Sequence, residues 1–346
     1  MRILVDIGHP VWVHFFRRAV EGWQRDGHEV LIAARDKDCT VALLEAFDLP
    51  YEVASRARGR GVWRLAREFA QRSLKIHKAI RAFRPDVIVT VNEPCGAQAG
   101  WLKGIPVVLF SDCELSTLEI RLSHPFADVV CKSVLAGGRV TPKTREYNSH
   151  PCLAYLDPRS FGNDSDLLAR AGLDPDERYV VMRLVEWGAH HDIGKSGIPD
   201  PVEVVRELEP LARVIVSHER PLPAEIADLS MEALGIPPQL YHQLIYQADL
   251  LIAEGGNAME AAFLGTPNVF LVSANVRMWD ELDHQGLMRK ARDQVDLLKI
   301  AKSILDDPSA KEGWRRRAVH AADSMDDMTA FTRRVVTCTA ESAGRA

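Results

Sequence analysis

The N-terminal half of the chain alternates short apolar runs with longer amphipathic segments, and this alternation restricts the folds it can adopt. Ile3–Ile7 and Glu29–Ala33 have the length and composition of buried strands, and His14–Asp26 between them has helical periodicity. Gly27 follows that helix, where a glycine commonly ends one. A strand, a helix and a second strand form a parallel β–α–β unit. The chain is therefore predicted to build a parallel sheet covered by helices.

The same pattern continues through the first half and returns after a segment, 137–163, that is rich in Pro, Gly and Asn. The first half is predicted to contain helices Thr40–Phe47, Val62–Phe83 and Cys95–Leu102 and strands Tyr51–Val53, Val87–Val91, Val107–Phe110 and Ala127–Cys131. The second is predicted to contain strands Tyr179–Arg183, Arg213–Ser217, Leu250–Ala253 and Asn268–Leu271 and helices Pro201–Leu208, Pro238–Gln247 and Ala258–Leu264. Helices Val295–Leu305, Lys311–Met325 and Thr329–Glu341 end the chain.

The length of 346 residues favours two domains, since one domain averages about 150 residues. We place the boundary near Tyr155. This gives an N-terminal α/β domain, 1–155, and a C-terminal α/β domain, 156–346, that includes the last helices. Open parallel sheets bind ligands at the carboxyl ends of their strands, so two such sheets facing each other create a cleft. Functional residues are expected directly after strands.

Composition narrows the class of protein. The chain is 47% hydrophobic and 26% charged, with a net charge of −5, which is typical of a soluble globular enzyme and argues against a general nucleic-acid binder. Its six cysteines lack metal-ligand spacing and indicate a reducing compartment. The first residues are predicted to form a strand, so we expect no leader segment. We expect a cytoplasmic protein, or one at most peripheral at the inner membrane face.

Gly255 and Gly256 stand between a predicted strand and a predicted helix, and this corner is the most specific binding signal in the sequence. Glycines let a backbone turn tightly and bring its amides close to a ligand, and a helix N-terminus adds N–H donors. With Asn257, the corner suits a diphosphate. Glu260 follows about one helical turn later, where its carboxylate can accept hydrogen bonds from ribose hydroxyls. The alternative is an ordinary β–α turn with a surface glutamate.

Polar side chains recur after the strands of the first domain. His9 follows the first strand and His14 is predicted to start the next helix, so both imidazoles can serve as a base or bind a phosphate. Asp112 and Glu114 follow another strand, and Asn92 and Glu93 follow a third. Alternatively, His14 packs beside its aromatic neighbours and one of the acids is a helix cap.

The second domain also has polar strand ends. Arg183 and His191 are candidates for phosphate or sugar contacts, and Ser217 and His218 follow a neighbouring strand. Metal binding is disfavoured, because adjacent histidines rarely bind one ion and no HExxH spacing occurs. We therefore expect no metal and no cofactor.

The stretch from Arg56 to Arg84 is strongly basic. It contains ten Lys or Arg and a single acid, Glu68, with apolar side chains interleaved. In an acidic protein such a segment can contact anionic lipid headgroups or a phosphorylated acceptor at a membrane surface. Solvated charges on a surface helix are the commoner explanation, and nucleic acid is a weaker third one.

Taken together, these residues resemble the DUF354 family, which is related to GT-B glycosyltransferases and to non-hydrolysing UDP-N-acetylglucosamine 2-epimerases. The likeness covers nearly the whole chain. Ile3–Phe16 is similar to the family's N-terminal signature, Ala189–Gly194 to its central one, and Glu254–Glu260 to the GT-B nucleotide motif. The resemblance implies two Rossmann-like domains facing across a cleft, the GT-B fold, with a nucleotide-sugar held between them.

The resemblance implies two reactions. In a glycosyltransferase of surface-glycan or polysaccharide biosynthesis, a base such as His9 deprotonates a glycan or lipid-linked acceptor. In an epimerase, carboxylates and an imidazole move a proton on the sugar, and Asp112–Leu115 is similar in position to the epimerases' Glu-Ala-Gly-Leu stretch. However, the epimerases' Thr-Arg-Pro-Glu and His-Arg-Arg-Glu-Asn motifs are absent from this sequence. We therefore favour the transferase, with an epimerase or hydrolase second and a non-catalytic nucleotide-sugar-binding protein third.

Overall fold

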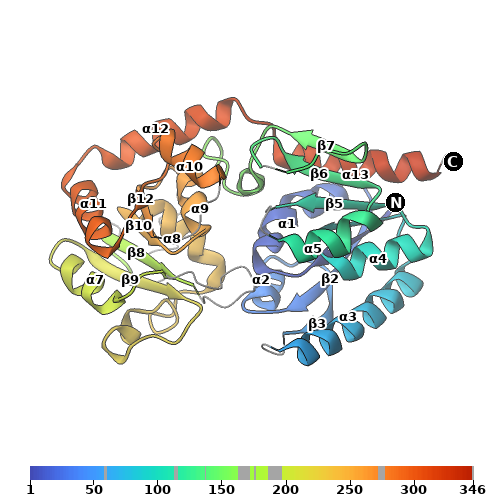
Figure 1. Ribbon diagram of the computed structural model, residues 1–346, viewed down its shortest axis with the longest axis horizontal. Coiled ribbons are helices and arrows are strands. Elements are labelled where there is room, and N and C mark those ends of the chain that lie inside the picture. Colours follow the sequence, from blue (N-terminus) through green and yellow to red (C-terminus); the bar gives the residue numbers. More distant parts are fainter. Residues whose placement is uncertain are drawn as a thin grey trace. The chain divides into compact units, whose positions relative to one another are not determined.

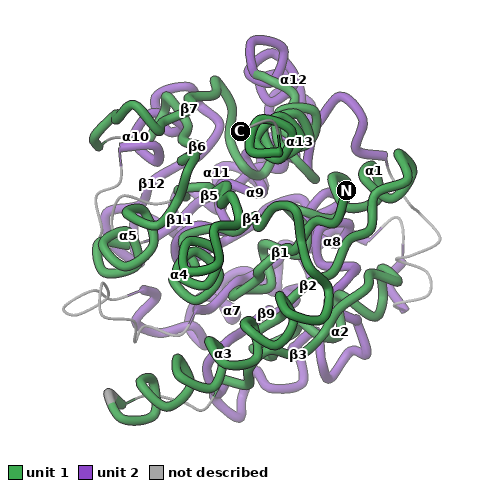
Figure 2. Tube along the Cα trace, turned by 90° about the vertical axis from the view of Figure 1, so that its right-hand side faces the viewer, with its two compact units in different colours: residues 1–155, 326–346 green, residues 156–325 purple. Residues whose placement is uncertain are grey.

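The chain folds into two compact units, each built around one parallel sheet (Figure 1). The computed structural model describes residues 1–57, 61–112, 116–136, 138–162, 172–174, 177–185, 197–271 and 277–344. Unit 1 comprises residues 1–155 and 326–346, and unit 2 comprises residues 156–325 (Figure 2). None of the helices in these ranges combines the length and hydropathy that crossing a bilayer requires.

Unit 1 contains a seven-stranded parallel sheet in the order β3-β2-β1-β4-β5-β6-β7. The strands are β1 (Arg2–Ile7), β2 (Glu29–Asp36), β3 (Tyr51–Arg56), β4 (Val87–Val91), β5 (Val107–Ser111), β6 (Val129–Ser133) and β7 (Thr144–Tyr147). The strand order reverses between β1 and β4, which pair directly. In open α/β sheets, the carboxyl ends at such a reversal are the usual ligand site.

Helices cover both faces of this sheet (Figure 1). They are α1 (Pro10–Arg25), α2 (Thr40–Ala46), α3 (Val62–Phe83), α4 (Pro94–Lys103), α5 (Thr117–Ser123) and α13 (Met328–Gly344). On one face, Ile76 and Ile80 of α3 and Ala97 of α4 join Leu4 and Ile88 of the sheet in a buried cluster. On the other face, Phe15, Phe110 and Phe331 pack edge to face, which fixes α1 and α13 on β5.

Unit 2 contains a five-stranded parallel sheet in the order β12-β11-β10-β8-β9. Its strands are β8 (Tyr179–Leu184), β9 (Arg213–His218), β10 (Leu250–Ala253), β11 (Asn268–Leu271) and β12 (Lys290–Ala291). Its helices are α7 (Pro201–Leu208), α8 (Tyr241–Gln247), α9 (Asn257–Leu264), α10 (Arg277–His284), α11 (Gln294–Asp306) and α12 (Ala310–Asp323). The strand order reverses between β8 and β10, so the predicted glycine corner follows a strand at the reversal.

The structure differs from the sequence prediction at two places that affect the site. Helix α1 begins at Pro10, four residues before His14, because proline suits the first helical position and His9 caps the helix. Helix α13 belongs to unit 1 instead of the second domain, because Phe331 packs between Phe110 and Tyr147. Strands β7 and β12 and helices α5 and α10 were not predicted.

Candidate functional site

Asp6, near the carboxyl end of β1, lies at the strand reversal of unit 1 and is 1% exposed. One carboxylate oxygen, Oδ1, accepts a hydrogen bond from Arg72 Nη2 at 2.7 Å, and Oδ2 accepts one from the Gly96 N–H at 2.9 Å. A Cβ at Gly96 would lie 2.5 Å from Oδ2, so this position requires glycine. The buried charge is therefore neutralised by an arginine and held by the first turn of α4.

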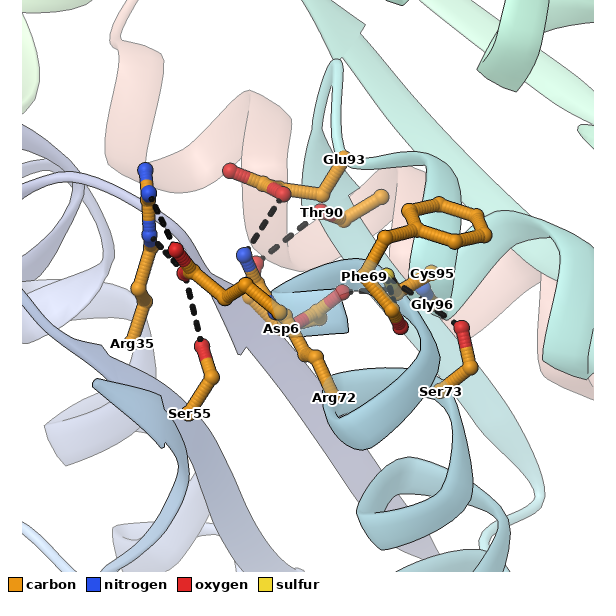
Figure 3. A network of polar contacts seen from close by, with 11 residues as sticks. Asp6, Arg35, Ser55, Phe69, Arg72, Ser73, Thr90, Glu93, Cys95 and Gly96 are labelled. Atoms are coloured by element: carbon orange, nitrogen blue, oxygen red, sulfur yellow. Dashed lines mark hydrogen bonds and ion pairs between the residues drawn. The ribbon is translucent and has the colours of Figure 1, made fainter. Parts of the chain in front are cut away.

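Arg72 also donates to Glu93, so one buried guanidinium joins two carboxylates (Figure 3). The distance from Arg72 Nη1 to Glu93 Oε2 is 2.8 Å, and Glu93 is the residue that precedes α4. Burial raises the pKa of the Glu93 carboxyl and the negative charge of Asp6 raises it further, although Arg72 lowers it. A carboxyl whose pKa is raised, at the carboxyl end of a sheet strand, is a candidate for acid–base chemistry.

A second, partly buried ion pair involves Arg35, which lies near Asp6 and Arg72 (Figure 3). Arg35, at the end of β2, donates to both oxygens of Glu68 at 2.6 and 3.0 Å, and the Ser55 hydroxyl donates to Glu68 Oε1 at 3.2 Å. Although burial raises the pKa of Glu68, these bonds and the charge of Arg35 lower it by more, so it lies below its ordinary value. Glu68 and Arg72 are one turn apart on the inner face of α3.

His9 caps helix α1 at the carboxyl end of β1. Its Nδ1 accepts a hydrogen bond from the Val11 N–H at 3.4 Å. A neutral imidazole that accepts at Nδ1 carries its proton on Nε2 and can donate from that atom. In this arrangement His9 is able to donate to a ligand oxygen from Nε2, and Nε2 can act as a base only if the proton moves to Nδ1.

His14 lies in the second turn of α1 and not at the strand end, because the helix begins earlier than predicted. Its ring stacks on Tyr155 with centroids 5.4 Å apart and meets Phe47 edge on at 5.5 Å. His14 therefore packs against aromatic rings, as the alternative prediction stated. The rings are those of Tyr155 and Phe47 and not those of its neighbours in the helix.

Asp112, after β5, is linked to β4 through Asn92. The Asn92 side chain donates to Asp112 Oδ1 at 2.6 Å, and its oxygen accepts from His124 Nε2 at 3.0 Å. Burial and the charge of Lys132 lower the pKa of His124, which favours the neutral ring. The ends of β1, β4 and β5 thus bring His9, Glu93 and Asp112 to one edge of the sheet. Glu114, the remaining candidate here, lies outside the described residues.

The glycine corner of unit 2 has the backbone geometry that the sequence suggested. Gly255 has φ +100°, a conformation that other residues rarely adopt, and no described atom lies within 4 Å of a Cβ built on it. Gly256 caps α9, and the N–H groups of Ala258 and Met259 donate to the Gly255 and Gly256 carbonyls, which closes a tight turn. Among the described residues, no atom fills the space beside Gly255, and the corner lies at a helix N-terminus.

Arg183, on β8, is held beside this corner by neighbours on three sides. Its Nη1 donates to the Ser217 hydroxyl at 2.8 Å, its Nη2 forms an ion pair with Glu219, and its guanidinium lies 5.7 Å from the Tyr241 ring centroid. The Tyr241 hydroxyl is buried and has no hydrogen-bond partner among the described residues. A cation and an unsatisfied hydroxyl together are suited to binding a phosphate or a sugar oxygen.

Glu260 lies one turn into α9 and is 7% exposed. His242 Nε2 lies 3.2 Å from Glu260 Oε1, and the Asn257 side chain donates to Oε2 at 3.2 Å. These contacts fix the carboxylate beside the glycine corner. Glu260 is thus a held acceptor beside the corner and not a surface side chain.

Two further predicted residues of unit 2 have different outcomes. The His218 ring is fixed by a hydrogen bond from Nδ1 to the Arg220 carbonyl at 2.8 Å, which leaves Nε2 as the acceptor of the neutral ring. His191 lies outside the described residues. The described part of the chain contains no group of three or more His, Cys, Asp or Glu that could hold a metal ion.

Fully buried Glu254 precedes the corner and organises its surroundings. Its oxygens accept from the Val185 N–H at 2.9 Å, the Ile198 N–H at 2.6 Å and Arg220 at 2.9 Å. These bonds tie three segments of unit 2 to the end of β10. We assign Glu254 a positioning role.

Sequence reasoning missed several of these residues. Asp6 and Arg72 were not proposed as site residues. Asp6 is an acid inside an apolar strand, and Arg72 has helical spacing to the apolar residues Ile76 and Ile80, so both positions could have been identified from the sequence. Tyr241 and His242 begin a short helix that does not follow a strand directly, so no local pattern marked them.

Comparison with known proteins assigns the chain to a family and to a class of fold. The model of a family described as "Protein of unknown function (DUF354)" matches residues 1–330. An uncharacterized protein of Methanocaldococcus jannaschii is 20% identical over 286 residues, which cover 77% of this chain and 80% of that protein. The predicted family is therefore confirmed.

Solved structures similar to the chain include enzymes of two kinds. UDP-GlcNAc 2-epimerase from Neisseria meningitidis, solved with UDP-GlcNAc, has a TM-score of 0.69 at 12% identity, with 97% of this chain and 100% of that chain covered. A spinosyn rhamnosyltransferase solved with thymidine diphosphate has a TM-score of 0.60 at 18% identity, with 97% and 100% covered. These likenesses confirm the predicted GT-B class of fold.

Proposed function

This chain belongs to DUF354, a family of proteins of unknown function, and we propose that it is a glycosyltransferase. It moves a sugar from a nucleotide-sugar donor to a glycan or lipid-linked acceptor. In this proposal unit 2 binds the donor, and strand-end groups of unit 1 act on the acceptor hydroxyl. The glycine corner of unit 2 is the observation that carries the proposal.

Each part of a nucleotide-sugar has a partner around that corner. The diphosphate is placed against Gly255, Gly256 and Asn257, at the N-terminus of α9, where the helix dipole favours negative charge. Arg183, together with its ion-pair partner Glu219, lies beside the corner and is proposed to donate to the phosphates, and Glu260 is proposed to accept from the ribose hydroxyls. A single bound nucleotide would therefore contact the glycine backbone, Arg183 and Glu260 together.

The transfer step requires a base and stabilisation of the leaving group. The acceptor oxygen attacks the anomeric carbon while a base removes its proton, and the bond from that carbon to the diphosphate breaks. His9 is the proposed base, with its proton moved to Nδ1. Asp112, held by Asn92, is the alternative base at the same edge. Arg183 and the start of α9 stabilise the departing nucleoside diphosphate.

An epimerase is the second candidate, and Glu93 favours it. Its carboxyl is partly buried next to Asp6 and Arg72, and its raised pKa suits the transfer of a proton at a sugar carbon. This reaction needs no acceptor, whereas transfer does.

Incubation of the purified chain with UDP-, GDP- and dTDP-sugars in the absence of acceptor separates the candidates. We expect binding without isomerisation and turnover only after acceptor is added. Isomerised sugar would replace the proposal with an epimerase, and rapid release of nucleotide would indicate a hydrolase. Failure to bind any of these donors would contradict a nucleotide-sugar function.

Glu260→Ala should weaken the binding of UDP by about 1–3 kcal/mol, the cost of losing a charged hydrogen-bond partner. Calorimetry with UDP and with 2′-deoxy-UDP tests the ribose contact directly, because wild-type protein should prefer UDP and Glu260→Ala should lose that preference. Glu225→Ala, an exposed acid of the same unit, is the control. Equal affinities of wild type and folded Glu260→Ala for UDP would remove Glu260 from the site.

A further inference from the structure

Large apolar side chains that are exposed to solvent concentrate on one group of helices in unit 1. Of the twelve found in the described residues, eight lie on α3, α4 and α5: Trp63, Leu65, Phe69, Leu74, Trp101, Leu102, Leu118 and Leu122. Helix α3 packs on α4 and α4 on α5, so these side chains belong to neighbouring helices. Clustered apolar exposure of this kind marks an interaction surface.

Helix α3 has two chemically different faces. Its inner face carries Glu68 and Arg72, which are buried and paired, followed by buried Ile76 and Ile80. Its outer face carries Trp63, which is 88% exposed, and Leu74, which is 72% exposed. Spacings of three, four and seven residues place exposed Arg67, Lys78 and Arg81 on the same outer face.

The charge on this outer face has one sign. Glu68 is the single acid of α3, and the structure uses it internally against Arg35. Arg64, Arg67, Lys75, Lys78 and Arg81 are all exposed. The outer face of α3 is thus a cationic surface from which a tryptophan and a leucine project, in a chain whose net charge is −5.

We propose that the outer face of α3, with the adjoining exposed side chains of α4 and α5, docks on an anionic lipid bilayer surface. Cations attract lipid phosphates, and a projecting Trp and Leu enter the boundary between headgroups and acyl chains. A second copy of the chain fits this face poorly, because pairing two such surfaces would oppose cations to cations. The inference does not depend on which reaction the protein catalyses.

Co-sedimentation of the full chain with vesicles tests the proposal. We expect binding to vesicles of phosphatidylcholine with phosphatidylglycerol and about tenfold weaker binding to phosphatidylcholine alone, because each cation near an anionic surface contributes separately. Trp63→Ser/Leu74→Ser and Arg67→Glu/Lys78→Glu should each weaken binding to the anionic vesicles by about tenfold or more. Higher salt should weaken wild-type binding as well.

Val295→Ser/Lys299→Glu is the matched control, since it removes an exposed apolar residue and an exposed cation from α11 of unit 2. It should leave vesicle binding unchanged. Wild-type protein that ignores anionic vesicles, or a control that loses as much binding as the α3 variants, would overturn the proposal. The proposal would also be overturned if Trp63→Ser/Leu74→Ser kept its vesicle binding and sedimentation velocity showed that the same variant dissociates an oligomer.

Discussion

Arg72→Met is expected to lower the free energy of unfolding by about 3–5 kcal/mol, because it removes one partner from a buried ion network and leaves the others uncompensated. Arg72 is 4% exposed and donates to both Asp6 and Glu93. Methionine fills a similar volume, so the expected loss comes from the charges and not from a cavity. Urea denaturation monitored by circular dichroism measures it.

Arg67→Met on the same helix is the control for helix propensity and for the loss of one cation. Its side chain is exposed, so the change in unfolding free energy should stay within about 0.5 kcal/mol. Arg72→Met/Glu93→Gln should recover part of the stability that Arg72→Met loses, because it removes one of the two unpaired carboxylates. Equal stabilities of Arg72→Met and wild type would show that the network contributes nothing to folding.

The pH dependence of these variants follows from the sign of the Glu93 shift. A carboxyl whose folded pKa lies above its unfolded value contributes stability at low pH and loses it as the pH rises through the folded pKa. The pKa of Glu93 is raised by burial and by Asp6, and removal of Arg72 raises it further. The loss of unfolding free energy in Arg72→Met should therefore be largest at neutral pH. It should shrink as the pH falls toward the pKa that Glu93 has in the unfolded chain. Urea denaturation of wild type and Arg72→Met at a series of pH values from neutral downward tests whether the difference in unfolding free energy decreases.

Much of the fold was predictable because its signals are local. Strand and helix periods repeat within short windows, so runs such as Val87–Val91 and Val107–Phe110 identified the parallel sheets. The Gly255 corner was also visible, since a positive φ between a strand and a helix favours glycine. In these places the sequence around a residue determines its conformation.

The charged network could not be found in the same way, because its partners come from distant parts of the chain. Arg72 meets Asp6 across 66 residues of sequence and Glu93 across 21. Within a stretch of ten cations, Arg72 has no distinctive composition. Its helical spacing to Ile76 and Ile80 was the only indication that it faces inward. The placement of α13 likewise depends on a distant contact, between Phe331 and Phe110.

His9→Ala should lower turnover by about 10²–10⁴-fold, the usual contribution of a positioned acid–base group, while it changes nucleotide affinity much less. The substitution also removes the cap on α1, because His9 Nδ1 accepts from the Val11 N–H. His9→Asn separates the two effects, since asparagine is a strong helix N-cap but has no imidazole. If the imidazole acts on substrate, His9→Asn should lose as much turnover as His9→Ala while its melting temperature stays close to that of wild type.

A third variant distinguishes the two chemical roles that the imidazole can play. Because Nδ1 accepts from the Val11 N–H, the neutral ring carries its proton on Nε2 and can donate it, whereas a base must have Nε2 unprotonated. Glutamine can donate through its amide but cannot accept a proton from an acceptor hydroxyl. His9→Gln should therefore remain as inactive as His9→Ala if His9 is the base, and it should recover turnover if His9 is a donor. Recovery would transfer the base role to Asp112, whose carboxylate Asn92 holds at the same sheet edge.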